Sequence, residues 1–410
     1  MKTYDTIIIG AGAAGIMAAL SSAKLNKKTL LLEKLPKIAI KLKATGGGRC
    51  NLTNTLNKDA FMQSFGKEGR FMTQALDNLT SKDLIEFFNT IGVPTHAPDG
   101  FRVFPTTHNS TTIIDALIKE LNVLNVTIKT SQKVKYISAQ DNKVVSVKTD
   151  SDIYYSNKII IATGGKGYPQ LGAEGDGYIL AQNLGHKIVQ PHPAMMPLKT
   201  KERWIANCRA DTISSVKMQV AIKKYKKLHA TGDLIFTKDG IRGPVVLDFS
   251  REITPLLSKY QEVPITINLT KGKNQEEIFK HIKQELSNNT HNLLSLLETL
   301  LPTSIANEFI KLIDAEKEDT FSKLSGIKRE ELIKLLAQTP LTIIGHDGFK
   351  MAMITRGGVS LKEIDPNTMQ SKIVKGLYFC GEVVNLDGPC GGYNLQWAFS
   401  SGNLAGETKD

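Results

Sequence analysis

Three glycines near the N-terminus form the most informative motif of the chain. Gly10, Gly12 and Gly15 follow an apolar run, Tyr4–Ile9, and open a segment rich in helix formers, Ala13–Leu25. In a strand–turn–helix, the first glycine permits the tight turn, the second lets the backbone approach a pyrophosphate, and the third lets helix and strand pack closely. The start of the helix adds unpaired N–H groups and a positive dipole end. This spacing therefore predicts a dinucleotide site.

A carboxylate stands where the ribose of such a dinucleotide is expected. Glu33 lies 23 residues after Gly10, at the end of a second apolar run, Thr29–Leu32. A carboxylate at this position accepts hydrogen bonds from ribose hydroxyls and repels a 2′-phosphate. Glu33 therefore argues against NADP at this site, while NAD and FAD both stay open on these residues alone.

A second glycine-rich segment follows within 20 residues of Glu33. Residues 45–51 read Thr-Gly-Gly-Gly-Arg-Cys-Asn. Three consecutive glycines have no value inside a helix or strand, but they suit backbone that is pressed against a flat or charged ligand. Arg49 adds a fixed cation with planar donors for a pyrophosphate, and Lys41 and Lys43 can assist it.

Two further segments resemble cofactor contacts. Ile161–Gly165 is the end of an apolar strand that runs into two glycines, and Gly381-Glu382 precedes a glycine-rich turn and a helix beginning near Gly392–Leu395. Glu382 is placed to bond a ribityl hydroxyl, or a water on the pyrophosphate. The helix start can face the flavin N1–C2=O edge, where reduction places negative charge. Asp176 is expected to cap a helix over Tyr178–Leu184. An extended FAD explains all four motifs together, which NAD alone does not.

The elements that position these motifs predict an α/β fold whose Rossmann-like domain is built from both chain ends. Residues 1–190 and 345–410 supply its two parts. Three prolines, Pro191, Pro193 and Pro197, mark the crossing into an insertion. There Val216, Met218, Val220 and Ile222 alternate with polar residues as in a half-buried strand, Val263–Leu269 is a second strand, and residues 276–337 follow a helical pattern.

Composition adds few constraints. The chain has 410 residues, with 52 Lys and Arg against 40 Asp and Glu. This balance suits nucleic acid, a membrane surface, anionic ligands or simply a lysine-rich proteome. Four cysteines without a CxxC pair, and no histidine cluster, predict no metal site and suit the reducing cytoplasm. The uncharged stretch 6–23 is interpreted as strand, turn and helix, so no membrane segment is expected.

The motifs resemble those of the two-dinucleotide-binding-domain flavoproteins, and more closely the YhiN/BaiN-like bacterial flavoproteins. The segments that carry the resemblance are Ala44–Asn54, Gly100–Pro105, Ala162–Gly165, Gly232–Thr237, Gly240–Pro244, Arg356–Val359 and Gly381–Gln396. That family includes enzymes described as aminoacetone oxidases and bile-acid-pathway reductases. The resemblance implies non-covalent FAD, a β-barrel-like substrate domain over residues 191–274 and a helical domain over residues 275–344.

The expected FAD contacts combine the motifs with the resemblance. They are Gly10, Gly12, Ala13, Ala14, Gly15, Glu33, Lys34, Lys41, Gly47, Gly48, Arg49, Asn51, Val134, Thr163, Gly164, Gly165, Gly381, Glu382, Gly392, Tyr393, Asn394, Leu395 and Gln396.

The expected activity is that of an FAD-dependent oxidoreductase. It would move two electrons between a small organic substrate and the flavin, with NAD(P)H as a transient donor or O2 as the second partner. No second strand–GxGxxG–helix is present for NAD(P)H. An arginine can hold a substrate carboxylate, and a tyrosine or histidine can pass a proton. The candidates for these roles are Arg102, Phe104, Tyr168, His192, Arg356 and Tyr393.

Three alternatives stay open, and one of them is a flavin-binding scaffold without turnover. An enzyme of the fumarate-reductase or aspartate-oxidase type shares the Ala-Thr-Gly-Gly and Gly-Asp-Gly features, but fits the helical stretch 276–337 less well. An RNA-binding flavoprotein that modifies tRNA is suggested by the net charge and by residues 217–227. The first of those lysines alternate with apolar residues, as on a solvated strand face, and few aromatics are interleaved, so nucleic acid is not the expected partner. The sequence predicts no oligomeric state.

Overall fold

The computed structural model describes residues 1–288 and 290–408 and divides into two compact units. Unit 1 comprises Met1–Pro193 together with the chain from Ala352 onward, and unit 2 comprises Ala194–Met351. The α/β fold, with an FAD-type domain built from both chain ends and a closed barrel in the inserted part, confirms the predicted fold class. The finer limits 191–274 and 275–344 stay predictions.

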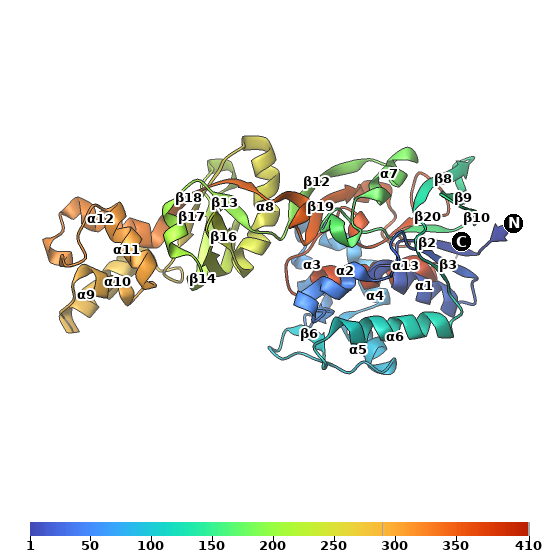
Figure 1. Cartoon of the computed structure of the whole chain (residues 1–410), viewed down its shortest axis with the longest axis horizontal. Helices are drawn as coiled ribbons and strands as arrows, with labels where there is room; N and C mark the ends of the chain where they lie inside the picture. Colours follow the sequence, from blue (N-terminus) through green and yellow to red (C-terminus); the bar gives the residue numbers. More distant parts are fainter. Residues whose placement is uncertain (289, 409–410) are drawn as a thin grey trace. The chain divides into compact units, whose positions relative to one another are not determined.

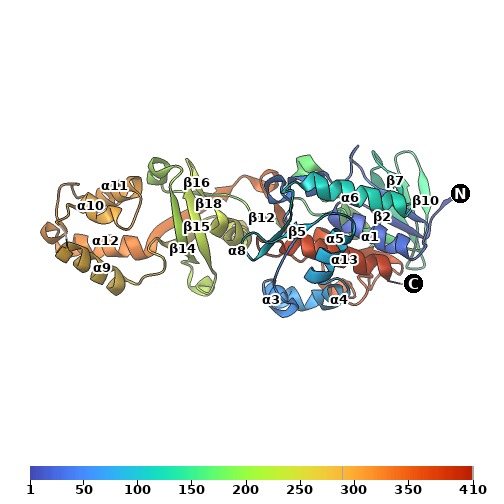
Figure 2. The same cartoon turned by 90° about the horizontal axis from the view of Figure 1, so that it is seen from below.

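The centre of unit 1 is a five-stranded parallel sheet (Figures 1 and 2). Its strands, in spatial order, are β20 (Leu377–Phe379), β11 (Ile159–Ile161), β2 (Thr6–Ile9), β3 (Thr29–Leu32) and β7 (Thr127–Lys129), and every neighbouring pair is parallel. The four strands other than β7 are buried throughout. Continuous apolar runs such as three successive isoleucines suit strands that are covered on both faces.

Two helices from opposite ends of the chain pack together against this sheet. They are α1 (Ala13–Lys24) and α13 (Tyr393–Glu407), which lie side by side in Figures 1 and 2. Glycine permits this approach, because a Cβ at Gly402 would lie 2.2 Å from the carbonyl oxygen of Ala14. The close packing of α1 on α13 is the contact that brings the two chain ends into one domain.

Unit 1 contains further helices and strands. The helices are α2 (Ile40–Ala44), α3 (Lys58–Gln63), α4 (Thr73–Asn78), α5 (Ser81–Thr90), α6 (Ser110–Val123) and α7 (Asp176–Asn183). The strands are β1 (Lys2–Thr3), β4 (Thr53–Asn54), β5 (Thr95–His96), β6 (Arg102–Pro105), β8 (Val134–Gln140), β9 (Lys143–Thr149), β10 (Ile153–Tyr155), β12 (Ile188–Ala194) and β19 (Ile354–Val359).

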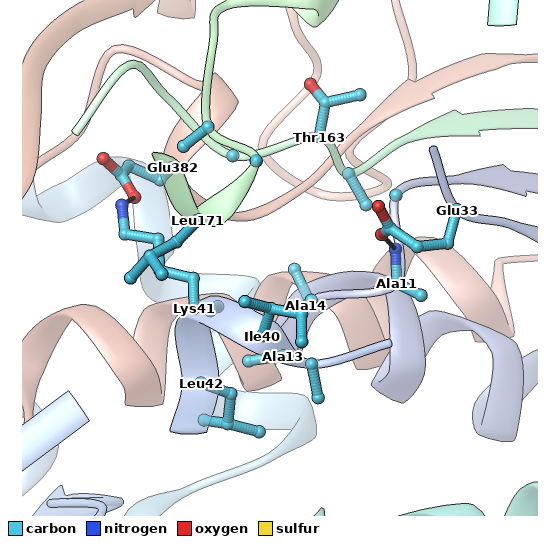
Figure 3. Close-up of a pocket in the computed structure, with 18 of the residues that line it drawn as sticks. Ala11, Ala13, Ala14, Glu33, Ile40, Lys41, Leu42, Thr163, Leu171 and Glu382 are labelled. Carbon is cyan, nitrogen blue, oxygen red and sulfur yellow. Dashed lines mark hydrogen bonds and ion pairs between the residues drawn. The ribbon is translucent and has the colours of Figure 1, made fainter. Parts of the chain in front are cut away.

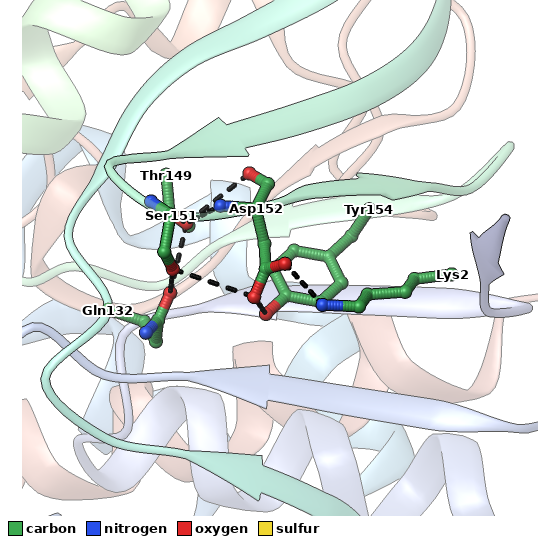
Figure 4. A network of polar contacts seen from close by, with 6 residues as sticks. All are labelled: Lys2, Gln132, Thr149, Ser151, Asp152 and Tyr154. Atoms are coloured by element: carbon green, nitrogen blue, oxygen red, sulfur yellow. Dashed lines mark hydrogen bonds and ion pairs between the residues drawn. The ribbon is translucent and has the colours of Figure 1, made fainter.

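A polar network fastens the first strand to the sheet β1-β10-β9-β8 (Figure 4). Asp152 accepts hydrogen bonds from Lys2 and from the Tyr154 hydroxyl, the latter at 2.9 Å. Thr149 donates to Gln132 at 2.9 Å beside it. Burial and the Asp152 carboxylate raise the pKa of Tyr154 to about 12, so this hydroxyl stays protonated as a donor.

Side chains cap two helices of unit 1, whereas the expected cap at Asp176 is wrong. Thr80 and Asp83 form a capping box on α5, and Asn109 accepts from Thr111 N–H at the start of α6. Asp176 was expected to cap its helix, but it is the first residue of α7, and Gly175 with φ of 86° precedes it. The Asp176 carboxylate instead binds Lys34 and Lys133, because its position in the first turn directs it to those cations.

Unit 2 begins as a closed six-stranded antiparallel barrel. Its strands, in spatial order, are β13 (Leu198–Thr200), β16 (Gly240–Arg242), β15 (His229–Phe236), β14 (Thr212–Val220), β17 (Val263–Asn268) and β18 (Thr339–His346). In β14 the predicted alternation holds, since Val216, Met218 and Val220 are buried and Lys217 is exposed. Helix α8 (Pro244–Tyr260) packs against β15.

Four helices complete unit 2 within the described ranges. They are α9 (Gln275–Asn288), α10 (Leu293–Glu298), α11 (Thr303–Leu312) and α12 (Gly326–Gln338). Helix α12 packs on α9 and on β17, and the buried side chains of helices and barrel form one apolar cluster. Among the described residues no helix combines the length and the apolar character that a bilayer crossing needs.

Candidate functional site

A cavity in unit 1 opens at the carboxyl ends of β2, β3 and β11, which is where parallel α/β sheets bind ligands. The starts of α1 and α13 and the short helix α2 supply other parts of its wall (Figure 3). The expected FAD contacts that line it are Gly10, Gly12, Ala13, Ala14, Glu33, Lys34, Lys41, Val134, Thr163, Gly164, Glu382, Asn394 and Leu395.

At each position of the first motif, a different steric requirement explains why the residue is glycine. Gly10 has φ of 100°, and a Cβ there would lie 2.6 Å from the carbonyl oxygen of Ala162. A Cβ at Gly15 would lie 1.9 Å from the carbonyl oxygen of Gly10, so helix and strand are in contact there. At Gly12 a Cβ would meet no atom within 4 Å. Gly12 begins α1 without a side-chain cap, so this helix start faces open space in the cavity.

Backbone amides hold the Glu33 carboxylate at the end of β3. One of its oxygens accepts from Ala11 N–H at 2.9 Å and the other from Leu35 N–H at 2.9 Å. An ionised carboxylate offers about four acceptor positions, so two donors leave capacity for hydroxyl groups of a ligand. Figure 3 shows Glu33 beside Ala11 at one side of the cavity.

An ion pair between Lys41 and Glu382 lies on the side of the cavity opposite Glu33 in Figure 3. Lys41 on α2 donates to Glu382 at 2.8 Å, and the other Glu382 oxygen accepts from Thr355 N–H at 2.8 Å. Ala13 and Ala14 of α1 lie between this pair and Glu33 in Figure 3. The cavity therefore carries an acidic group at each side and the uncapped start of a helix between them.

Four charges form a second ionic network at the cavity wall. Lys34 pairs with Glu174 at 2.6 Å and also with Asp176, and Lys133 pairs with Asp176 at 2.9 Å. Burial raises the pKa of Asp176, but the hydrogen bonds from the two lysines outweigh it and hold that pKa below its usual value. Lys34, Lys133 and Asp176 all line the cavity.

The predicted helix start at Gly392–Leu395 is where α13 begins. Gly392 has φ of 84° and provides no side-chain cap. The Asn394 side chain accepts from Gly388 N–H at 2.8 Å and donates to Gly388 O at 2.9 Å, which fixes the preceding turn. Trp397 and Ala398, one turn further along, also line the cavity.

The rest of the expected FAD contacts lie outside the cavity lining. In the glycine-rich loop, Arg49 donates to Gly46 O at 3.2 Å and lies 5.2 Å from the ring centre of Phe104. Gln396 is buried and donates to Leu79 O at 3.1 Å. The others outside the lining are Gly15, Gly47, Gly48, Asn51, Gly165, Gly381, Gly392 and Tyr393.

Of the catalytic candidates, none lines the cavity within the described residues. Arg102 pairs with Asp99 at 2.6 Å, and Arg356 lies 3.8 Å from Asp387. Tyr168 has a positive φ of 56° at a turn, and His192 lies on β12. Phe104 is buried, and Tyr393 packs on Phe61. Two of the candidates are neighbours, since the Arg102 guanidinium lies 6.0 Å from the ring centre of Phe104.

Part of the cavity wall is formed by residues that belong to no sequence motif. These residues come from segments far apart in the chain, and they are Leu35, Ile40, Leu171, Met353 and Ile354. They are ordinary apolar residues, so neither their type nor their spacing marks them. The short strand and turn signals around Thr163 and Glu382 were the only local indication of their neighbourhood.

Three of the four cysteines offer no activated thiol. Burial raises the pKa of Cys50 to about 12 and that of Cys208 to about 12, and it raises the pKa of Cys380 further. Each of these thiols is therefore protonated at neutral pH. Among the described residues no group of three or more His, Cys, Asp or Glu is arranged to hold a metal ion.

Comparison with known proteins identifies the family of the chain. A family model described as HI0933-like protein Rossmann domain matches residues 4–408. The chain belongs to the HI0933-like family. A 3-dehydro-bile acid delta(4,6)-reductase of Clostridium scindens is 31% identical over 402 residues, covering 97% of both chains. A ribosomal RNA dihydrouridine synthase of Haemophilus influenzae is 31% identical over 405 residues, covering 98% of this chain and 97% of that one.

Solved flavoenzymes share the fold at low identity. A 3-ketosteroid delta1-dehydrogenase of Sterolibacterium denitrificans has a TM-score of 0.52 and 11% identity, covering 99% of both chains. The open conformation of a flavocytochrome c3 fumarate reductase has a TM-score of 0.51 and 17% identity, covering 99% of this chain and 78% of that one. The family and its curated relatives make the HI0933-like chain an FAD-dependent oxidoreductase, as predicted. The resemblance to YhiN/BaiN-like flavoproteins is confirmed as well.

Proposed function

We propose that the chain binds FAD non-covalently in the cavity of unit 1 and reduces a carbon–carbon double bond that is conjugated with a carbonyl group. One observation carries the reaction: two relatives that match along nearly the whole chain are both named for saturating such a bond. In one it belongs to a 3-oxo steroid acid, and in the other to the uracil ring of RNA. The two substrates share only this chemical group.

The cavity offers groups that match the parts of FAD. The open space at Gly12 and the uncapped start of α1 suit the pyrophosphate, since backbone N–H groups at a helix start bind anions. Glu33, held by two backbone amides, suits the ribose hydroxyls of the adenosine. Lys41, paired with Glu382, supplies a cation toward the ribityl and phosphate region. These assignments explain why the wall combines glycines, a helix start and two carboxylates.

The flavin end of the site is assigned to the start of α13. Asn394 and Leu395 line the cavity, and Gly392 leaves the first N–H groups of the helix without a side-chain cap. The positive end of a helix dipole stabilises the negative charge of a reduced flavin, which favours reduction. FAD held there would, in its reduced form, provide the hydride for the carbon β to the carbonyl, and a proton would add at the α carbon. The residue that delivers the proton stays among the tyrosine and histidine candidates of the sequence analysis, Tyr168, His192 and Tyr393, while Arg102 and Arg356 stay candidates for holding a substrate carboxylate.

NAD(P)H is the proposed electron donor. A reductase must regain two electrons after each turnover, and the names of both relatives describe net reduction. The chain has one strand–GxGxxG–helix, at Gly10–Gly15. NAD(P)H therefore binds transiently and leaves after hydride transfer, and the fold keeps FAD as its resident dinucleotide.

The first candidate for the substrate is a small conjugated ketone or acid. A second candidate, a uracil base within RNA, is favoured by the match to the ribosomal RNA dihydrouridine synthase of Haemophilus influenzae, which extends over 98% of this chain. Both candidates use the same cavity and the same hydride transfer, so they differ in how the substrate is held.

Anaerobic titration of the yellow protein with NADH and with NADPH tests the proposal. We expect loss of the oxidised flavin absorbance with at least one of the two donors. Reduction only by an amine, with hydrogen peroxide formed in air, would identify an oxidase and contradict the proposal. Re-oxidation of the reduced protein by fumarate, but not by a conjugated ketone, would favour the fumarate-reductase alternative.

A further inference from the structure

We infer that unit 2 carries an RNA-docking surface on its barrel, made of a lysine-rich loop, the end of α8 and a polar groove. The inference rests on the proposed function in the form whose substrate is a uracil base, and it assigns the part of the chain that holds the rest of the RNA. We call this region the basic barrel surface. Its components are residues 223–227, Lys259 and Tyr260 of α8, and the groove over β14 and β17.

The loop between β14 and β15 concentrates cations. It contains a 3-10 turn, Lys223–Tyr225, and its lysines are exposed to solvent, as is Lys259 at the end of α8. The loop lysines are Lys223, Lys224, Lys226 and Lys227. Within the part of the chain that the structure describes, none of these five lysines forms an ion pair with a carboxylate. Their charges are therefore available to a polyanion.

Two tyrosines lie among these lysines. The rings of Tyr225 and Tyr260 have centres 6.1 Å apart at an angle of 72°, and their hydroxyls are 3.4 Å apart. Lys224 lies 5.7 Å from the ring centre of Tyr225, and Lys259 lies 5.0 Å from that of Tyr260. Tyr260 is 39% exposed, so part of its ring is accessible to a ligand. Aromatic faces beside cations are the combination that binds unpaired bases next to their phosphates.

The groove continues this surface along the barrel. Lys217 and Gln219 of β14 stand opposite Asn268 and Thr266 of β17, and these four line the groove. Its volume is about 490 Å³, and its lining also includes Lys273, Asn274, Gln275, Gln338 and Glu276, whose carboxylate is paired with Lys280 at 3.0 Å. Gln219 donates to the backbone carbonyl of Lys226, which joins the groove directly to the loop. Lysines with carboxamide and hydroxyl groups suit phosphates together with ribose 2′-hydroxyls.

Charge is distributed unevenly within unit 2. Residues 194–274 hold 15 Lys and Arg against 7 Asp and Glu, whereas residues 275–338 hold 8 against 11. A lysine-rich proteome would raise the charge of both segments, so the excess on the barrel needs a local reason. An anionic bilayer would satisfy the exposed lysines, but a flat headgroup layer cannot contact the inside of a groove. RNA can contact the loop, the tyrosines and the groove together, so RNA is the occupant we assign.

Binding of a labelled single-stranded oligouridine RNA to the full, FAD-loaded chain tests the inference. The variant carries Lys224→Ala, Lys226→Ala and Lys227→Ala. Its matched control carries Lys317→Ala, Lys323→Ala and Lys334→Ala, three exposed lysines from the helical part of the same unit. We expect the loop variant to bind at least tenfold more weakly, and its logarithmic salt slope to fall by about 2, since each phosphate contact on a single strand contributes roughly 0.7. The control should match the unsubstituted chain.

A second pair of variants examines the tyrosines. Tyr260→Phe should retain RNA binding because the ring face remains, whereas Tyr260→Ala should weaken it severalfold. Equal losses in the loop variant and its control, or the absence of salt-dependent binding in the unsubstituted chain, would overturn the inference. Retention by phosphatidylglycerol vesicles that equals or exceeds RNA binding would also overturn it.

The readout separates this inference from the reductase proposal. The same variants are reduced with NAD(P)H and re-oxidised with cyclohexenone, which needs no RNA contact. If the chain binds oligouridine through the loop but never reduces cyclohexenone or uridine, the surface stands and the proposed function fails. If cyclohexenone is reduced and RNA binding is absent, the proposed function stands and the surface fails.

Discussion

The cavity of unit 1 and the basic barrel surface of unit 2 differ in the kind of groups that they offer to a ligand. The cavity depends on backbone: a glycine at φ of 100°, an uncapped helix start and a carboxylate held by two amides. The barrel surface consists of exposed side chains: two tyrosines, and five lysines that form no ion pair with a carboxylate in the described part of the chain. Backbone recognition demands glycines at fixed spacing, whereas side-chain recognition tolerates many arrangements. The two regions should therefore respond differently to the same small substitutions.

The largest effect is expected from Gly15→Ala in unit 1. The new methyl group would lie 1.9 Å from the carbonyl oxygen of Gly10, so helix and strand must separate. We expect a loss on the order of 3 kcal/mol in the free energy of unfolding of unit 1, with loss of FAD. The chain has one tryptophan in each unit, Trp397 in unit 1 and Trp204 in unit 2. Denaturant unfolding of single-tryptophan variants should show a shift for Trp397 alone, and an equal shift for Trp204 would contradict this view.

A matched pair of glycine substitutions sharpens the comparison. Gly12 and Gly326 both lie at helix starts where a Cβ meets no atom within 4 Å. Gly12→Ala should leave the fold intact but fill the space assigned to the pyrophosphate. FAD should then bind at least tenfold more weakly, which is about 1.4 kcal/mol. Gly326→Ala should leave FAD affinity unchanged. Fluorescence titration of the apoprotein with FAD measures both, and equal affinities would remove Gly12 from the site.

Glu33→Gln is expected to have a smaller effect. It removes the charge that the Ala11 and Leu35 amides stabilise, and with it the strongest acceptor for ribose hydroxyls. FAD affinity should fall about tenfold, since hydrogen bonds to charged groups contribute roughly 1.5–3 kcal/mol. Glu363 provides the control, because it accepts from Lys187 N–H at 2.8 Å but lies outside the cavity lining. Glu363→Gln should leave FAD binding as it is, so a similar loss in both variants would count against the assignment.

The smallest effect concerns pH and the network at the cavity wall. Lys34 and Lys133 lower the pKa of Asp176 in the folded state. A lowered carboxyl pKa stabilises the fold above the unfolded value near 3.9, and that contribution is lost as pH falls through the folded pKa. We expect Asp176→Asn to reduce stability at neutral pH and to flatten the acid limb of the pH–stability profile below about pH 4. An unchanged acid limb would show that this ionic network contributes nothing to the pH dependence of folding stability.

The sequence could predict features that are local in the chain. The strand–turn–helix at Gly10–Gly15, the capping box of Thr80 and Asp83, and the alternation of Val216, Met218 and Val220 each occupy a few residues, and the structure contains all three. The tertiary contacts were not predictable in this way. Lys34 and Asp176 are 142 residues apart, and no local pattern relates them.

The aromatic part of the basic barrel surface likewise depends on contacts between residues far apart in the chain. The alternation of Lys217 with apolar residues predicted a solvated strand face, and Lys217 does lie on the exposed face of β14. The following lysines lie beyond the strand in a turn, where the end of α8 brings Tyr260 beside Tyr225. Those tyrosines are 35 residues apart in the sequence, so the aromatic component of the surface is visible only after folding.

Single-turnover re-oxidation of the reduced chain, without oxygen, tests the central claim most directly. The FAD-loaded protein is reduced with NAD(P)H, freed of excess donor and mixed with cyclohexenone or with its saturated counterpart, cyclohexanone, while flavin absorbance is followed. The account predicts that cyclohexenone restores the oxidised flavin spectrum with formation of the saturated ketone, and that cyclohexanone leaves the flavin reduced. If neither conjugated ketone nor uridine-containing RNA re-oxidises the flavin and only oxygen does so, the chain is not the reductase proposed here.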